Sequence, residues 1–208
     1  MNAERLQRGH RWFAWCYSSF IARSDPRRFR AARERIMGEV KGRVLEFGAG
    51  GGTSFPFYPP EAQVIATEPD PHMLKRAQQR VRELGVSNID VRQAPAERLP
   101  FDDASFDHVV CSWVLCTVDD LPGTLREVRR VLKPDGTFRV MEHVRNDTNV
   151  VWRMAENAIA GPWHWAGAGC RINQRTERAI EDAGFRFEWI EHESGWLQPI
   201  IYGVARAA

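Results

Sequence analysis

Two acidic residues and a glycine-rich turn form the part of this sequence best suited to chemistry. Glu46 lies in a short apolar run, and glycines follow it at positions 48, 50, 51 and 52. Glycines directly after a strand let the backbone turn sharply and bring its N–H groups close to a ligand. A second acid, Glu68, ends the apolar run 64–67, 20 residues after Gly48. A carboxylate at that spacing can accept both hydroxyls of a ribose, which predicts a nucleotide-type cofactor.

The charge of the first acid indicates which cofactor this is. In dinucleotide-binding loops the third glycine lets a pyrophosphate approach the helix that follows. Here the pattern E-x-G-x-G-x-G runs from Glu46 to Gly52, so a carboxylate would lie beside the pyrophosphate and repel it. The amine and the sulfonium of S-adenosylmethionine are cationic. The sequence therefore favours S-adenosylmethionine over NAD.

From about Arg43 to its end, the chain resembles the class I S-adenosylmethionine-dependent methyltransferases. Besides the glycine loop, four segments carry this resemblance in the family's order: 68–74, 94–101, 106–112 and 125–137. The resemblance implies that the second-strand acid holds the ribose and that residues after the fourth strand lie beside the transferable methyl group. The cofactor contacts that it implies are Glu46, Gly48, Ala49, Gly50, Glu68, Pro69, Met73, Ala96, Glu97, Cys111, Ser112 and Leu115.

One position departs from the family pattern, because Pro95 stands where these enzymes usually carry an aspartate. The hydrogen bond from the adenine amino group is then expected to be accepted by Glu97 or by a backbone carbonyl. The departure also keeps open a different class of function, a catalytically silent protein that binds S-adenosylmethionine as a partner or regulator.

A narrower resemblance, to the methyltransferase-like alkyl-thiol methyltransferases, rests mainly on the second half of the chain. The segments that carry it are 57–60, 114–118, 141–144, 162–163, 169–173 and 201–203. Members of that group methylate small hydrophobic thiols, and their animal members carry a hydrophobic N-terminal anchor that we do not expect here. Related quinone and lipid methyltransferases share much of the scaffold, so oxygen, nitrogen and carbon acceptors remain alternatives to a thiol.

Two histidines are the candidate catalytic bases. A thiol reacts as its thiolate, from an unperturbed pKa of about 8.5, and needs only a modest base to reach it. His143, at the end of the fifth predicted strand, and His164, in an aromatic-rich segment, suit that role. The alternative is that each only hydrogen-bonds to the backbone. The candidate acceptor-binding residues are Tyr17, Trp113, Cys116, Trp163 and Trp165.

The composition is that of an ordinary globular protein. The chain has 208 residues, a net charge of +2, 27% charged residues and 43% hydrophobic residues, which suits one α/β domain. Residues 1–43 hold eleven Lys/Arg against four Asp/Glu. We interpret this surplus as a solvated helical surface, with weak attraction to an anionic membrane surface as the alternative. Nucleic acid is a disfavoured substrate, because 111–114 read C-S-W-V where amino-methylating enzymes of DNA and RNA usually place N/D-P-P-Y/F.

The sequence also predicts the compartment. It has no apolar run of about 18 residues that could span a membrane, and its N-terminus lacks the apolar region and cleavage site of a secretory signal. The four cysteines have neither C-x-x-C nor metal-ligand spacing. We therefore predict a cytoplasmic protein with reduced thiols and no bound metal. We interpret Cys111 and Cys170 as packing residues and Cys16 and Cys116 as residues of the pocket.

Alternating strands and helices predict how these residues are brought together. We expect strands at 43–47, 63–67, 89–92, 106–111, 137–143, 185–193 and 199–205, and helices near 53–57, 71–84, 119–132 and 173–183. This alternation is typical of a parallel sheet with helices on both faces, whose ligands bind beyond the carboxyl ends of the strands. The predicted fold is α/β, a Rossmann-like doubly wound sheet of seven strands, and the resemblance implies that the last two are antiparallel.

Two segments interrupt this alternation within the single domain that we predict for 1–208. Residues 1–37 have two helical stretches, the first crowded with aromatic residues. We predict that they form a lid over the cofactor pocket, with a membrane-surface helix or plain core packing as the alternatives. Residues 144–172 are rich in tryptophan and are the predicted insertion that shapes the substrate pocket.

Overall fold

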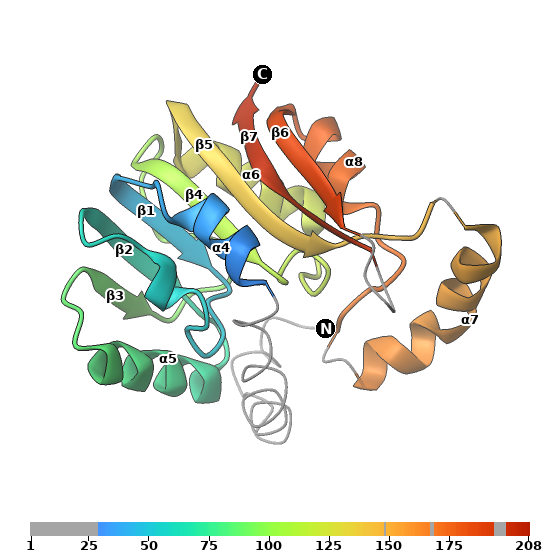
Figure 1. Cartoon of the computed structure of the whole chain (residues 1–208), viewed down its shortest axis with the longest axis horizontal. Coiled ribbons are helices and arrows are strands. Elements are labelled where there is room, and N and C mark those ends of the chain that lie inside the picture. The colour runs from blue at the N-terminus through green and yellow to red at the C-terminus, as the bar shows by residue number, and fades with distance from the viewer. Residues whose placement is uncertain (1–28, 148, 167–168, 194–198) are drawn as a thin grey trace.

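The computed structural model describes residues 29–147, 149–166, 169–193 and 199–208, which are built around one seven-stranded sheet (Figure 1). The strands are β1 (Gly42–Phe47), β2 (Ala62–Thr67), β3 (Ile89–Arg92), β4 (Phe106–Ser112), β5 (Leu132–His143), β6 (Phe185–Glu193) and β7 (Ile200–Ala207). Their order in the sheet is β3-β2-β1-β4-β5-β7-β6. β1 to β5 pair in parallel, and β7 is antiparallel to both β5 and β6. The predicted seven-stranded α/β fold is confirmed.

Helices cover both faces of this sheet. They are α4 (Arg30–Met37), the 3-10 helix η2 (Phe55–Phe57), α5 (Pro71–Leu84), α6 (Leu121–Val131), α7 (Val150–Ala166) and α8 (Thr176–Asp182). Leu125 of α6 and Ile180 of α8 belong to the hydrophobic core on one face. Ile36 of α4 and Ala77 of α5 belong to the core on the other face. Figure 1 shows α4 in front of the sheet and α6 behind it.

Local sequence sets the bounds of α5. The Asp70 carboxylate caps its first turn by accepting hydrogen bonds from the backbone N–H groups of His72 (2.7 Å) and Met73 (3.1 Å). Pro71 occupies the first helical position, where no N–H is needed. Gly85 ends the helix in the left-handed conformation, with φ of 66°. The predicted bounds, 71–84, are confirmed, and the cap fixes the helix close to Glu68.

The start of β5 differs from the prediction. The residues 133–136 predict a turn before a strand that begins at 137, yet β5 begins at Leu132 directly after α6. Leu132 pairs with Phe106 of β4, and the register shifts before His108 pairs with Thr137. The Pro-Asp-Gly residues therefore form an irregularity inside a long strand, because pairing with β4 outweighs their turn propensity.

The described end of the predicted lid packs into the core. Ile36 and Met37 of α4 are fully buried against the sheet. Phe29, which precedes α4, contacts the Trp113 ring with centroids 5.1 Å apart. The rest of the predicted lid, residues 1–28, lies outside the described residues, so the lid and its membrane-surface alternative stay predictions.

The predicted insertion 144–172 contains α7, which extends away from the sheet in Figure 1. Several of its apolar side chains are exposed, among them Val151, Trp152 and Met154. Among the described residues, no helix has the length and the apolar character needed to cross a membrane.

Candidate active site

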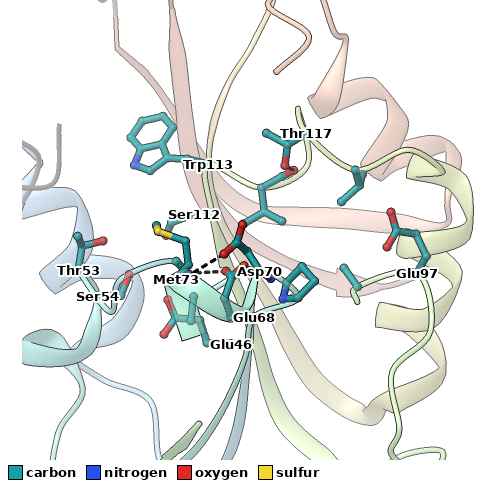
Figure 2. Close-up of a pocket in the computed structure, with 17 residues that line it drawn as sticks. Glu46, Thr53, Ser54, Glu68, Asp70, Met73, Glu97, Ser112, Trp113 and Thr117 are labelled. Carbon is teal, nitrogen blue, oxygen red and sulfur yellow. Dashed lines mark hydrogen bonds between the residues drawn. The ribbon is translucent and has the colours of Figure 1, made fainter. Parts of the chain in front are cut away.

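A cleft of about 170 Å³ opens at the carboxyl ends of β1, β2 and β4 (Figure 2). Its wall combines the loop after β1, the turn after β2, residues 96–97, Ser112 at the end of β4 and part of the segment 113–118 that follows. Ten of the predicted cofactor contacts line it: Glu46, Gly48, Ala49, Gly50, Glu68, Pro69, Met73, Ala96, Glu97 and Ser112. Residues far apart in the sequence meet here because parallel strands end at the same edge of the sheet.

The loop after β1 passes very close to the segment after β4. Gly48 has φ of 66°, in the left-handed region that favours glycine. A Cβ atom added at Gly48 would lie 2.5 Å from a methyl carbon of Val114. Any side chain at this position would therefore strain the backbone and push the two walls of the cleft apart.

Glu68 ties the loop after β1 to the turn after β2. Its Oε2 accepts a hydrogen bond from the Gly50 N–H (2.8 Å), and its Oε1 accepts one from the Asp70 N–H (2.9 Å). Burial raises the pKa of Glu68 to about 7, an effect that these two backbone N–H groups partly offset. Each carboxylate oxygen keeps a lone pair that can accept a ligand hydroxyl.

Glu46 provides a second buried carboxylate in the wall. Burial raises the pKa of Glu46 to about 7, and the nearby hydroxyls of Ser54 and Tyr58 and the Arg33 guanidinium lower it in part. The Arg33 Nη1 donates to Ser54 Oγ at 2.6 Å, which links α4 to this cluster. A buried carboxylate is costly unless a cation or hydrogen-bond donors satisfy it.

Two polar atoms of the wall are buried without a hydrogen-bond partner among the described residues. They are Glu46 Oε2 and Ser112 Oγ. Buried polar atoms are usually paired, so two unpaired ones in one cleft indicate a polar ligand. The carboxylate of Glu46 suits a cationic group of that ligand.

Glu142 of β5 orders the segment after β4, a contact that the sequence did not predict. Its Oε1 accepts hydrogen bonds from the N–H groups of Val114 (2.7 Å) and Leu115 (3.0 Å). The side chain is fully buried, and burial raises the pKa of Glu142 to about 7. Trp113, the residue before Val114, has φ of 62°, a rare conformation for a bulky side chain. The available signal was an acid directly after the apolar residues Val140 and Met141 near the end of β5.

Two predicted cofactor contacts do not reach the cleft. Cys111 and Leu115 are fully buried in the hydrophobic core beside α6 and α8. In a strand, successive side chains point to opposite faces, so Ser112 lies in the wall of the cleft while Cys111 points into the core.

The predicted acceptor-binding residues are spread more widely. Trp113 lines the cleft, and it lies above Glu46 and Glu68 in the view of Figure 2. Cys116 is buried next to Cys170 and is not part of the wall. Trp163 is 45% exposed on α7 and also lies outside the wall. Tyr17 and the side chain of Trp165 are outside the described residues.

The two candidate bases have different surroundings. His143 does not line the cleft, but its ring lies 4.3 Å from that of Trp113 between centroids. His164 is on α7, and its Nδ1 is buried without a hydrogen-bond partner in the described part of the chain. Thr53, Asp70, Thr117 and Val118 also line the cleft, and the sequence did not predict them as contacts.

Comparison with known proteins identifies the family. A methyltransferase domain model matches residues 45–140. The human thiol S-methyltransferase TMT1A is 34% identical over 170 residues, which cover 78% of this chain and 69% of TMT1A. The chain belongs to the class I S-adenosylmethionine-dependent methyltransferases. This methyltransferase is also 32% identical to the phosphatidylethanolamine N-methyltransferase of Cereibacter sphaeroides, over 71% of its own length and 72% of the relative.

Solved structures agree with this assignment at the level of the fold. The crystal structure of YcgJ from Bacillus subtilis matches with a TM-score of 0.68 and 20% identity, over 86% of this chain and 97% of YcgJ. The methyltransferase uses S-adenosylmethionine. The cleft fits this cofactor, because it combines an unpaired buried carboxylate oxygen, suited to a cation, with a second carboxylate that can accept hydroxyls.

Proposed function

We propose that this methyltransferase methylates the sulfur of a small hydrophobic thiol. The observation that carries the proposal is the apolar wall formed after β4, where Trp113, Val114 and Val118 line the cleft. An apolar wall selects an apolar acceptor. The 34% identity to a protein named thiol S-methyltransferase supports the choice of sulfur.

The cofactor roles that we propose follow from charge and hydrogen bonding. Glu46 binds the cationic amine of the cofactor, and Glu68 accepts the ribose hydroxyls. The backbone of Gly48, Ala49 and Gly50 gives close access. The remaining contacts that we propose are Pro69, Met73, Ala96, Glu97 and Ser112. When bound, S-adenosylmethionine supplies a methyl group on a sulfonium, and the task of the protein is to align the acceptor with it.

We propose that a histidine is the general base that accepts the proton of the acceptor thiol. The imidazole takes the proton of the acceptor S–H group and becomes an imidazolium, which leaves the acceptor as a thiolate that can act as the nucleophile toward the methyl group. His143 is the better supported candidate, because it packs against Trp113 of the cleft wall. His164 on α7 remains the second candidate.

A lipid-like acceptor is the alternative that a specific observation favours. The exposed apolar side chains of α7, such as Val151 and Met154, offer a surface suited to lipid. The relative named phosphatidylethanolamine N-methyltransferase supports an amine acceptor of that kind.

A methyl-transfer assay distinguishes a thiol acceptor from the other acceptors and from a protein that only binds the cofactor. The full-length protein is incubated with methyl-labelled S-adenosylmethionine and parallel panels of thiols, amines, phenols and quinols. We expect label in hydrophobic thiols and little in the other panels. Label only in amines or quinols would overturn the thiol proposal. Cofactor binding by calorimetry with no product in any panel would instead indicate a silent binding protein.

A further inference from the structure

Two cysteine thiols meet beside the cleft, and the proposed function makes no use of this contact. The Sγ atoms of Cys116 and Cys170 are 3.5 Å apart, although the residues are 54 positions apart in the sequence. Both thiols are free. Because a disulfide bond is about 2.05 Å long, the two sulfur atoms need to approach by only about 1.5 Å to form one.

Hydrogen bonds already hold the two segments side by side. The Arg171 N–H donates to the Cys116 carbonyl at 2.8 Å. The Gln174 side-chain amide donates to the Leu115 carbonyl, also at 2.8 Å. The Arg171 guanidinium donates to the Val118 carbonyl. The contact between the thiols is therefore part of an ordered junction between the segment after β4 and the segment before α8.

The two thiols differ in access and in acidity. Cys116 is 2% exposed, whereas Cys170 is only partly buried. The hydrogen bond between the two thiols, helped by Trp163 and the positive charge of Arg171, lowers the pKa of Cys170. The same hydrogen bond and burial raise the pKa of Cys116. A thiolate is the reactive form, so Cys170 is the thiol that a dissolved oxidant meets first.

We propose that Cys116 and Cys170 form an oxidisable pair that reacts with hydroperoxides, with Cys170 as the attacking thiolate and Cys116 as the resolving thiol. The Cys170 sulfur attacks one oxygen of the hydroperoxide, the O–O bond breaks, and the other oxygen leaves with a proton as an alcohol, or as water from hydrogen peroxide. Cys170 is oxidised to a sulfenic acid and the hydroperoxide is reduced.

The second step closes the disulfide. The Cys116 sulfur attacks the sulfenic sulfur of Cys170, the S–O bond breaks, and the hydroxide leaves as water with the proton of Cys116. In sum, two thiols and one hydroperoxide give a disulfide, an alcohol and water. The cross-link joins Cys116, whose neighbours Thr117 and Val118 line the cleft, to the segment before α8.

The test maps the cross-link in the full-length, reduced protein, so it needs neither cofactor nor acceptor and is independent of the proposed function. The protein is treated with about one equivalent of hydrogen peroxide, alkylated while folded, unfolded, alkylated with a second label and digested. We expect one disulfide-linked peptide pair, Cys116 with Cys170, which dithiothreitol reverses. Cys111, fully buried, is the internal control and takes only the second label.

Three variants assign the two roles. Cys170→Ser is expected to abolish both the cross-link and the capture of sulfenic acid by dimedone. Cys116→Ser is expected to abolish the cross-link but to leave a sulfenic acid on Cys170 that dimedone captures. Cys16→Ser, the matched control, is expected to keep the cross-link. A cross-link through another cysteine, sulfinic acid on Cys170 without a cross-link in the native sequence, or dimedone capture at Cys116 would overturn the proposal. Mapping the disulfide in the native sequence tests whether Cys116 and Cys170 form the cross-link even if a serine variant fails to fold.

Discussion

The indole of Trp113 and the imidazole of His143 pack together beside the cleft, with ring centroids 4.3 Å apart and ring planes inclined by 34°. Trp113 lines the cleft, and His143 lies next to it at the end of β5. The neighbouring Glu142 accepts the N–H groups of Val114 and Leu115. The end of β5 thus holds the segment after β4 by ring packing and by hydrogen bonds, and Trp113 keeps its unusual φ of 62° between them.

Removing the Glu142 carboxyl group is expected to loosen this segment. Glu142→Ala leaves two buried backbone N–H groups without their acceptor, which costs about 1–3 kcal/mol for each group. We expect a lower free energy of unfolding in urea and a weaker affinity for the thiol substrate that accepts the methyl group. Glu142→Gln is the matched control, because its amide oxygen still accepts both N–H groups. An equal loss of stability in Glu142→Ala and Glu142→Gln would contradict the role of the side-chain oxygen as a hydrogen-bond acceptor.

Glu68→Ala is expected to weaken cofactor binding by about 2–4 kcal/mol, because it removes the charge-assisted hydrogen bonds proposed for the ribose. It also releases the N–H groups of Gly50 and Asp70. Isothermal calorimetry with S-adenosylhomocysteine measures the change. Glu83→Ala on the exposed side of α5 serves as the control. Unchanged affinity in Glu68→Ala would refute the assigned ribose contact.

Two glycines of the loop after β1 provide a matched pair. Gly48→Ala places a Cβ atom 2.5 Å from Val114 in a backbone with φ of 66°. We expect it to cost about 1–3 kcal/mol of stability and to weaken cofactor binding. Gly51→Ala meets no atom within 4 Å and is expected to change neither. Thermal melts and calorimetry on both variants test this difference, and a harmless Gly48→Ala would exclude the close approach of the two walls.

The buried carboxyl groups predict how stability depends on pH. The pKa of Glu46, Glu68 and Glu142 is raised from 4.5 to about 7 in the folded protein. A raised pKa means that the folded state holds the proton more tightly. This contribution to stability is therefore fully present below pH 4.5 and is lost as the pH rises through about 7.

We expect the free energy of unfolding of the cofactor-free protein to fall between about pH 5 and 8, by up to about 3 kcal/mol for each carboxyl group. Urea titrations across this range measure the slope. Glu46→Gln cannot ionise at this position and is expected to give a shallower slope than the native sequence. An identical slope would show that Glu46 titrates near its ordinary pKa.

The proposed base makes a separate pH prediction. With a thiol acceptor, His143→Ala is expected to lower the transfer rate most at neutral pH, and the defect is expected to shrink toward about pH 9, where thiolate is abundant without a base. His192→Ala, an exposed histidine paired with Glu177, is the control. A defect of constant size at all pH values would assign His143 a packing role beside Trp113, and the same experiment on His164→Ala tests the second candidate.

Local patterns in the sequence were enough to predict the family, the alternation of strands and helices, and most of one wall of the cleft. Asp70, Pro71 and Gly85 fix the ends of α5 through contacts within a few residues. The Gly48 loop and Glu68 form a recognisable pair because both follow a strand directly. These signals involve residues that are close together in the sequence, so local sequence patterns are enough to predict them.

Only the tertiary structure decided the contacts between segments that lie far apart in the chain. Glu142 meets the amides of Val114 and Leu115 across 28 and 27 positions, and Cys116 meets Cys170 across 54. Pairing with β4 likewise moved the start of β5 to Leu132. Each of these contacts depends on which strands are neighbours and on the face to which a side chain points. Strand order and register arise from packing of the whole sheet, which no local stretch of residues encodes.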